Sequence, residues 1–361
     1  MTKLHELEQN GQSIWYDFIR RDMLTGPGLA DLVEAGIRGV TSNPSIFQNA
    51  IAGSTLYDDQ ITDLGDMAPD VVFEALAIAD IKAAADVLAG VFASSQGGDG
   101  YVSLEVSPTL AHDTEGTVAD AHRLWTKVDR PNLMIKVPAT PAGVTAIEQL
   151  TADGMNINAT LMFSLADYEA VAQAYVAGAK RCIEPSSLAS VASFFVSRVD
   201  SYTDAALDAI GTPEAGALKG KAAIANAKLA YRRYQEIFEG SAFADLAARN
   251  VRPQRALWAS TSTKNPSYRD VMYVEDLVGP NTVNTAPPAT IEAFEDHGNV
   301  TPDTLTNGVD EARKVFADLA GMGIDFDVIT ETLQVDGVRA FADAYASLLD
   351  AIADKQVAIA S

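Results

Sequence analysis

Strand-like and helix-like segments alternate along almost the whole of this 361-residue chain. Short runs rich in β-branched and aromatic residues predict strands, and the longer runs between them have the three-and-four apolar spacing of helices. About eight such alternations in one unbroken series are typical of a (β/α)8 TIM barrel. We therefore predict an α/β barrel with strands at residues 13–19, 38–45, 101–106, 132–138, 156–163, 190–199, 255–261 and 271–278.

The sequence shows no boundary between domains. No linker, internal repeat or shift in composition interrupts the alternation, so we expect a single barrel domain over residues 1–361, with additional helices at 217–239 and 303–355. An open doubly wound sheet is the rival fold. It is disfavoured because no glycine-rich dinucleotide loop follows the first predicted strand.

Composition narrows the classes of partner. The chain carries 49 acidic and 26 basic residues, a formal net charge of −23, so we expect no nucleic acid or anionic membrane as a partner. Its single cysteine, Cys182, suits a reducing cytoplasm, and its 4 histidines lack metal-ligand spacing, so we expect no metal. We expect no signal peptide, no run of residues reaches a membrane-spanning length, and the chain could be a monomer or a homodimer.

One lysine lies inside an apolar predicted strand. Lys136 follows Leu-Met-Ile and precedes Val-Pro, and Thr140-Pro141 then begins a helix. An amine in apolar surroundings loses hydration, which disfavours its charged form, and a neutral amine attacks carbonyl carbon. Lys136 is thus a candidate Schiff-base lysine. The alternative is a lysine that reaches from the strand end to water.

Polar residues recur near the carboxyl ends of the other predicted strands, where barrel enzymes build their active sites. If strand alternation points them inward, carboxylates, amides and hydroxyls converge on the lysine, a set suited to carbonyl chemistry. A structural polar network, a turn or a helix cap explains each residue taken singly. The candidates are Asp17, Thr41, Asn43, Glu105, Asn158, Thr160 and Ser193.

Three later residues form a candidate phosphate site. Arg198 lies five residues after Ser193 and would face the opposite side of the strand, so we expect it in the loop beyond the sixth strand. Ser262 and Lys264 likewise follow the end of the seventh predicted strand. Late barrel loops often hold phosphate, for which arginine offers a forked donor pair and lysine a point charge. The alternative is a set of surface cations.

These residues lie in motifs that resemble the transaldolase family over nearly the whole chain. Gly39-Val-Thr-Ser-Asn-Pro-Ser-Ile-Phe47 resembles the first signature of that family, and Asn132 to Thr140 with Gly154 to Ser164 resembles the second. Ser103-Leu-Glu-Val106, the segment from Ala192 to Val199 and that from Asn284 to Thr290 also match. The resemblance implies a barrel enzyme without a cofactor, acting on sugar phosphates in the pentose phosphate pathway.

The resemblance also implies a role for each candidate. Lys136 would form a Schiff base with the ketose, Glu105 and Thr160 would position a water, and Asp17 would take the C4 hydroxyl proton. A dihydroxyacetone unit would pass from sedoheptulose 7-phosphate to glyceraldehyde 3-phosphate, giving erythrose 4-phosphate and fructose 6-phosphate. The resemblance assigns hydroxyl binding to Thr41, Asn43, Asn158 and Ser193, and phosphate binding to Arg198, Ser262 and Lys264.

Two alternatives stay open beside this hypothesis. One is a fructose 6-phosphate aldolase-like enzyme that releases dihydroxyacetone, although those enzymes tend to carry glutamine where this chain has Glu105. The other is a non-catalytic barrel that only binds sugar phosphates. The chain departs from many family members at Lys264, where an arginine is usual, so that a point charge replaces a fork.

Overall fold

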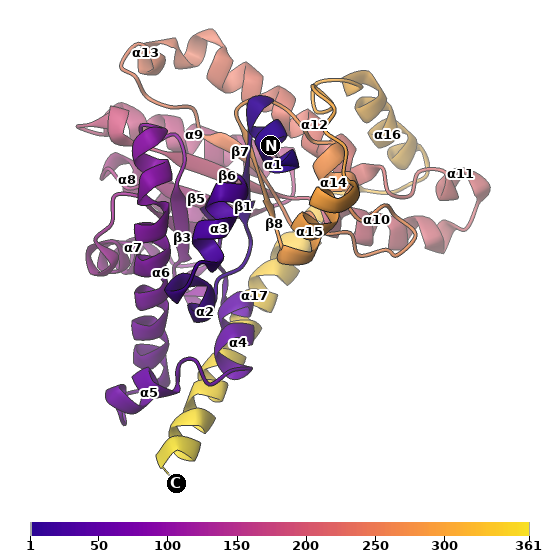
Figure 1. Ribbon diagram of the computed structural model, residues 1–361. Coiled ribbons are helices and arrows are strands. Elements are labelled where there is room, and N and C mark those ends of the chain that lie inside the picture. Colours follow the sequence, from indigo (N-terminus) through magenta and orange to yellow (C-terminus); the bar gives the residue numbers. More distant parts are fainter. Residues whose placement is uncertain (1, 361) are drawn as a thin grey trace.

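A closed ring of eight parallel strands forms the centre of the protein, seen here in a computed structural model that describes residues 2–360 (Figure 1). Each strand pairs with the next along the chain, and β1 pairs with β8 to close the ring. The predicted (β/α)8 barrel is confirmed. The strands are β1 Gln12–Tyr16, β2 Ile37–Val40, β3 Tyr101–Glu105, β4 Leu133–Pro138, β5 Ile157–Met162, β6 Ser190–Phe195, β7 Arg255–Ala259 and β8 Thr282–Ala286.

Helices surround the ring and follow the strands. The first half of the chain contains α1 Lys3–Gln9, α2 Arg21–Thr25, α3 Gly28–Ala35, α4 Pro44–Ala52, α5 Asp58–Leu64, α6 Pro69–Ser94, α7 Thr114–Val128, α8 Pro141–Ala152 and α9 Leu165–Arg181. The second half contains α10 Ser197–Ile210, α11 Pro213–Gly216, α12 Ala222–Tyr234, α13 Ala244–Ala247, α14 Met272–Glu275, α15 Pro288–His297, α16 Val309–Gly321 and α17 Phe326–Ala360. Within residues 2–360, no helix is both long enough and apolar enough to cross a membrane.

The prediction of the eighth strand was wrong. Residues 271–278 contain the short helix α14, and β8 lies further along at Thr282–Ala286. The apolar residues Val271, Val274 and Val278 are spaced as on a helix, and all three pack into one buried cluster beside β1. The true strand escaped notice because its sequence, Thr-Val-Asn-Thr-Ala, is mostly polar.

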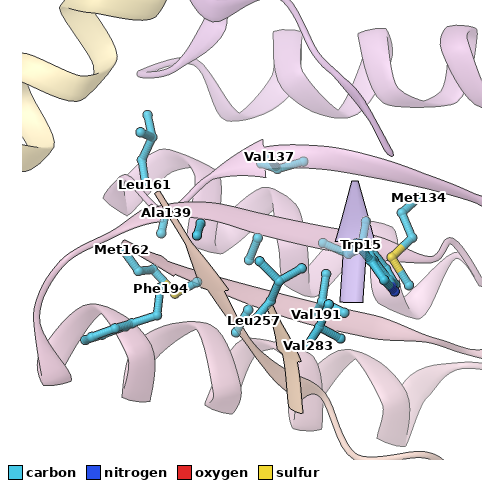
Figure 2. Close-up of a cluster of buried hydrophobic side chains, with 14 of the residues drawn as sticks. Trp15, Met134, Val137, Ala139, Leu161, Met162, Val191, Phe194, Leu257 and Val283 are labelled. Atoms are coloured by element: carbon cyan, nitrogen blue, oxygen red, sulfur yellow. The ribbon is translucent and has the colours of Figure 1, made fainter. Parts of the chain in front are cut away.

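A layer of apolar side chains fills the barrel interior below the carboxyl ends of the strands. Trp15, Met134, Val191, Leu257 and Val283 are buried in one hydrophobic cluster (Figure 2). Trp15 is fully buried, and a Cβ on Gly39 of β2 would lie 2.6 Å from its indole ring. Glycine at that position therefore makes room for the tryptophan. This apolar layer fills the lower part of the barrel interior, so the polar residues lie at the carboxyl ends of the strands.

The longest helix covers one side of the ring. α17 spans 35 residues and packs along α4, with further contacts to α5, α6, α10 and β5 (Figure 1). Lys355 near its end donates to the Ser54 carbonyl oxygen and forms an ion pair of 2.8 Å with Asp58. The segment 303–355, predicted to be mostly helical, contains α16 and most of α17. Gln334 of α17 donates to the Ala139 carbonyl oxygen just beyond β4, so this helix lies against the carboxyl side of the barrel.

Candidate active site

Strand register turns the predicted polar residues toward the barrel interior. Glu105 pairs with Lys136 across β3 and β4, and Lys136 pairs with Asn158 across β4 and β5. Parallel neighbours in register point to the same face. Ser193 joins this face because its hydroxyl donates to the Asn158 amide oxygen at 2.7 Å. Side chains from four consecutive strands therefore meet inside the barrel.

Lys136 is buried at the centre of this group. Its side chain is 6% exposed, and its Nζ lies 3.4 Å from Glu105 Oε2 and donates to the Ser42 carbonyl oxygen at 3.1 Å. The Phe341 ring of α17 lies over the amine, with 5.5 Å from Nζ to the ring centroid. The alternative of a lysine that reaches from the strand end to water does not hold.

Two buried side-chain oxygens, one on β3 and one on β5, have no hydrogen-bond partner in the part of the chain that the structure describes. Glu105 Oε2 and Thr160 Oγ1 are both buried, and neither has a hydrogen-bond partner among residues 2–360. Burial raises the pKa of Glu105, and the nearby charge of Lys136 opposes that rise. A buried hydroxyl and a carboxyl group with spare capacity are suited to hold a water or a substrate hydroxyl and to move protons.

Asp17 lies just beyond β1 and belongs to a separate hydrogen-bond chain. Its Oδ1 accepts from the Thr41 hydroxyl at 2.7 Å, and the Thr41 and Thr285 hydroxyl oxygens are 2.6 Å apart. Burial raises the pKa of Asp17, whereas the Thr41 hydrogen bond and the charges of Lys136, Lys264 and Arg198 act in the opposite direction. Asp17 thus lies within electrostatic reach of both the lysine and the two cations.

Amide and hydroxyl groups line the next part of the interior. Asn158 Nδ2 donates to Ser103 Oγ at 2.9 Å, and Asn158 Oδ1 accepts from Ser193, so the three side chains form one buried chain. Asn43 is the N-cap of α4, where its side-chain oxygen accepts from the Ile46 amide at 3.0 Å. The cap and a site role are compatible, because this bond uses only the oxygen of the amide.

The predicted phosphate residues come together, but one prediction about them was wrong. Arg198 is the second residue of α10 rather than part of a loop, because β6 ends at Phe195 and the helix begins at Ser197. Lys264 donates to the Ser262 hydroxyl at 2.7 Å. Burial lowers the pKa of Lys264, the positive charge of Arg198 lowers it further, and Asp17 opposes both.

Two like charges close together favour an anion between them. The Arg198 guanidinium forms no hydrogen bond or ion pair within residues 2–360, and it lies 5.4 Å from the Phe195 ring centroid. Burial lowers the pKa of Arg198. A partly buried guanidinium beside an exposed lysine amine is a suitable phosphate site.

A side cavity of about 500 Å³ reaches the group from another direction. It lies between α4, α6, α7 and α17, and its lining includes Glu105 but not Lys136, Arg198 or Lys264. Its lining carries more acidic than basic side chains, and its one arginine, Arg123, is paired with Glu74 and Asp120. The cavity therefore adjoins the lysine, and its charge disfavours an anionic ligand.

Sequence reasoning missed two side chains of the site. Thr285 was overlooked as a site residue because its strand was placed too early, although it lies in a motif that resembles the family. Phe341 carries no signal in the sequence, since an apolar residue on a helix is ordinarily part of the core. Only the packing of α17 shows that its ring lies over the lysine.

The comparisons with known proteins agree with this geometry. The family model for transaldolase/fructose-6-phosphate aldolase matches residues 14–352. A Frankia alni protein named transaldolase is 52% identical over 98% of this chain and 97% of its own. The chain belongs to this family. Transaldolases of Thiobacillus denitrificans and Mycolicibacterium smegmatis are 51% and 45% identical, covering 97% and 96% of this chain and 99% and 96% of their own.

Proposed function

We propose that this chain is a transaldolase that moves a dihydroxyacetone unit through a Schiff base on Lys136. The donor is sedoheptulose 7-phosphate and the acceptor glyceraldehyde 3-phosphate, which gives erythrose 4-phosphate and fructose 6-phosphate in the pentose phosphate pathway. The observation that carries the proposal is the buried Lys136 amine, 3.4 Å from Glu105 and surrounded by inward-facing polar residues. Family membership and the names of the relatives support it.

The first half of the reaction builds and cleaves a covalent adduct. The Lys136 amine adds to the ketose carbonyl carbon, and the carbinolamine loses water to become an iminium ion. Glu105 and Thr160, whose buried oxygens have no other hydrogen-bond partner within residues 2–360, position that water and carry its protons. Asp17 then removes the C4 hydroxyl proton, the C3–C4 bond breaks, and the aldose leaves with a three-carbon enamine still on the lysine.

The second half reverses these steps with a new aldehyde. The enamine carbon attacks the acceptor carbonyl carbon, Asp17 returns the proton to the new hydroxyl oxygen, and hydrolysis of the iminium frees the ketose. Thr41, Asn43, Asn158 and Ser193 bind the hydroxyls of the three-carbon unit. Arg198, Ser262 and Lys264 bind the phosphate of donor and acceptor in turn. The metabolic substrates and the single thiol, Cys182, support a cytoplasmic location.

Borohydride trapping tests the proposal. Reduction in the presence of fructose 6-phosphate should fix a three-carbon adduct on Lys136, located by peptide mass mapping, and Lys136→Met should show none. Lys219→Met is a matched control, because Lys219 is a partly buried lysine paired with Asp208 outside the site, and it should leave the adduct intact. An adduct on another lysine, or no adduct on the wild-type enzyme, would refute the assignment and favour a barrel that only binds sugar phosphates.

A second assay separates a transaldolase from an aldolase. With fructose 6-phosphate alone, a transaldolase retains the three-carbon unit and releases little dihydroxyacetone. Addition of erythrose 4-phosphate should start turnover. Rapid release of dihydroxyacetone without an acceptor would instead assign the chain to the aldolases named in the same family model.

A further inference from the structure

The enamine on the lysine must survive until an acceptor arrives, and the barrel alone does not cover it. Water that reaches the adduct allows release: the enamine carbon takes a proton, water adds to the iminium carbon, and the C–N bond breaks to give dihydroxyacetone and free amine. Exclusion of water from a closed site is the physical means of preventing this. Lys136 is only 6% exposed, although it lies at the carboxyl end of the barrel.

The apolar cover of the lysine comes from the C-terminal helix. The Phe341 ring lies 5.5 Å from Lys136 Nζ, and Phe341 itself is 5% exposed. The polar contacts of the Lys136 amine are the Ser42 carbonyl oxygen and the Glu105 carboxyl group. The Phe341 ring is an apolar wall on the side of the amine that faces α17.

The helix that carries the ring is fixed on both sides of it. Gln334 donates to the Ala139 carbonyl oxygen at 3.1 Å, just beyond β4, and Lys355 holds the far end against Ser54. Residues 334, 341, 348 and 355 recur every seven positions and so share one face of the helix. Phe341 and Leu348 on that face are buried, whereas Val335 is 58% exposed.

We propose that Phe341 is a positioning residue that shields the covalent three-carbon unit from water. The shield makes transfer of that unit to an acceptor aldehyde faster than its release as dihydroxyacetone. This inference rests on the proposed Schiff-base function. The ring acts by occupying space beside the amine, so an aliphatic side chain of similar bulk preserves the effect. Helix α17 thus completes the active site from outside the barrel.

The test measures the ratio of two rates in the full-length protein. One rate is release of dihydroxyacetone from fructose 6-phosphate alone, and the other is transfer to erythrose 4-phosphate. Phe341→Ala should raise the release-to-transfer ratio by about tenfold or more, and Phe341→Leu by less than about threefold. A loss of stability alone lowers both rates together and leaves their ratio unchanged.

Two control variants on the same helix sharpen the result. Leu348→Ala removes a buried side chain one heptad away, and Val335→Ala removes an exposed one, and neither should move the ratio. An unchanged ratio in Phe341→Ala would overturn the inference, and so would an equal rise in Leu348→Ala or in Phe341→Leu. Borohydride trapping on each variant keeps the tests separate, because an adduct on Lys136 with an unchanged ratio refutes the shield alone.

Discussion

Two carboxylates flank β3, one before it and one at its end, and their surroundings are opposite. Asp99 at the amino end accepts from the Trp15 indole at 2.7 Å, from the Ser13 hydroxyl and from Arg255 at 3.2 Å. Glu105 at the carboxyl end has an ion pair of 3.4 Å with Lys136, and its Oε2 accepts no hydrogen bond within residues 2–360.

The hydrogen bonds of Asp99 stabilise the fold, whereas Glu105 has an oxygen available for a substrate. The donors around Asp99 come from β1 and β7, so its bonds tie together strands that are distant along the chain. Such a satisfied network stabilises the fold, whereas a carboxyl group with unused capacity is available to a substrate. In barrels of this type the amino end holds the fold together and the carboxyl end reacts.

The largest effect expected at the carboxyl end is that of Lys136→Met. Removal of the proposed nucleophile should lower kcat by roughly 10⁴-fold or more. The free energy of unfolding of the Lys136→Met variant should differ from that of the wild type by less than about 2 kcal/mol. The reason is that Glu105 can take up a proton once the lysine charge is gone. Steady-state kinetics and urea denaturation check both parts. Substantial residual transfer would contradict the comparison.

Asp99→Ala is the corresponding change at the amino end. It leaves the Trp15 N–H without its acceptor and removes the carboxylate that pairs with Arg255, whose remaining acceptors are neutral oxygens. We therefore expect a loss of about 3 kcal/mol in the free energy of unfolding. The folded fraction should retain kcat within about twofold, since the site lies at the other end of the barrel. A variant with normal stability and low kcat would reverse the assignment of the two ends.

Sequence patterns predicted the ring and the inward face for a physical reason. Strand parity is strict, so one buried lysine in β4 fixes which residues of β3 and β5 accompany it. Glu105 and Asn158 follow directly from that rule. The same reasoning placed Arg198 beyond the strand, although it lies in the first turn of α10 and not in a loop.

The remaining parts of the site depend on tertiary packing. The mostly polar β8 resembles a loop, so Thr285 was not recognised as a partner of Thr41. Phe341 lies on the apolar face of a helix. Such a face predicts that the helix is buried on that side, but it does not identify the residues that pack against it. Its neighbour Lys136 is distant along the chain, and no local pattern encodes such a contact.

Glu105→Gln tests the carboxyl end through pH. We expect kcat to fall about a hundredfold, as for a group that moves protons. Burial raises the pKa of Glu105 in the folded protein above its unfolded value. The unfolded chain therefore binds fewer protons between these values, and wild-type stability falls as the pH rises through that window.

Glutamine does not titrate, so the Glu105→Gln variant lacks this loss of stability. Its free energy of unfolding should therefore rise relative to that of the wild type as the pH rises from about 4 toward neutrality. Loss of the Lys136 ion pair adds a difference in the free energy of unfolding that does not depend on this titration. The test is therefore the change of the difference with pH and not its size at one pH. Urea unfolding at several pH values measures it. A difference in stability that stays constant with pH would show that Glu105 titrates as an ordinary exposed acid.

The smallest effect concerns the proposed phosphate-binding residues, which would bind substrate without taking part in the bond changes. Lys264→Ala should raise KM for sugar phosphates about tenfold, the value of one charge-assisted hydrogen bond, and change kcat little, because phosphate is held equally in ground and transition states. Lys264→Arg should lower KM by supplying a forked donor pair. Lys314→Ala is the matched control, since that lysine is 72% exposed and pairs with Asp318. An unchanged KM in Lys264→Ala would leave Arg198 as the residue that holds the phosphate.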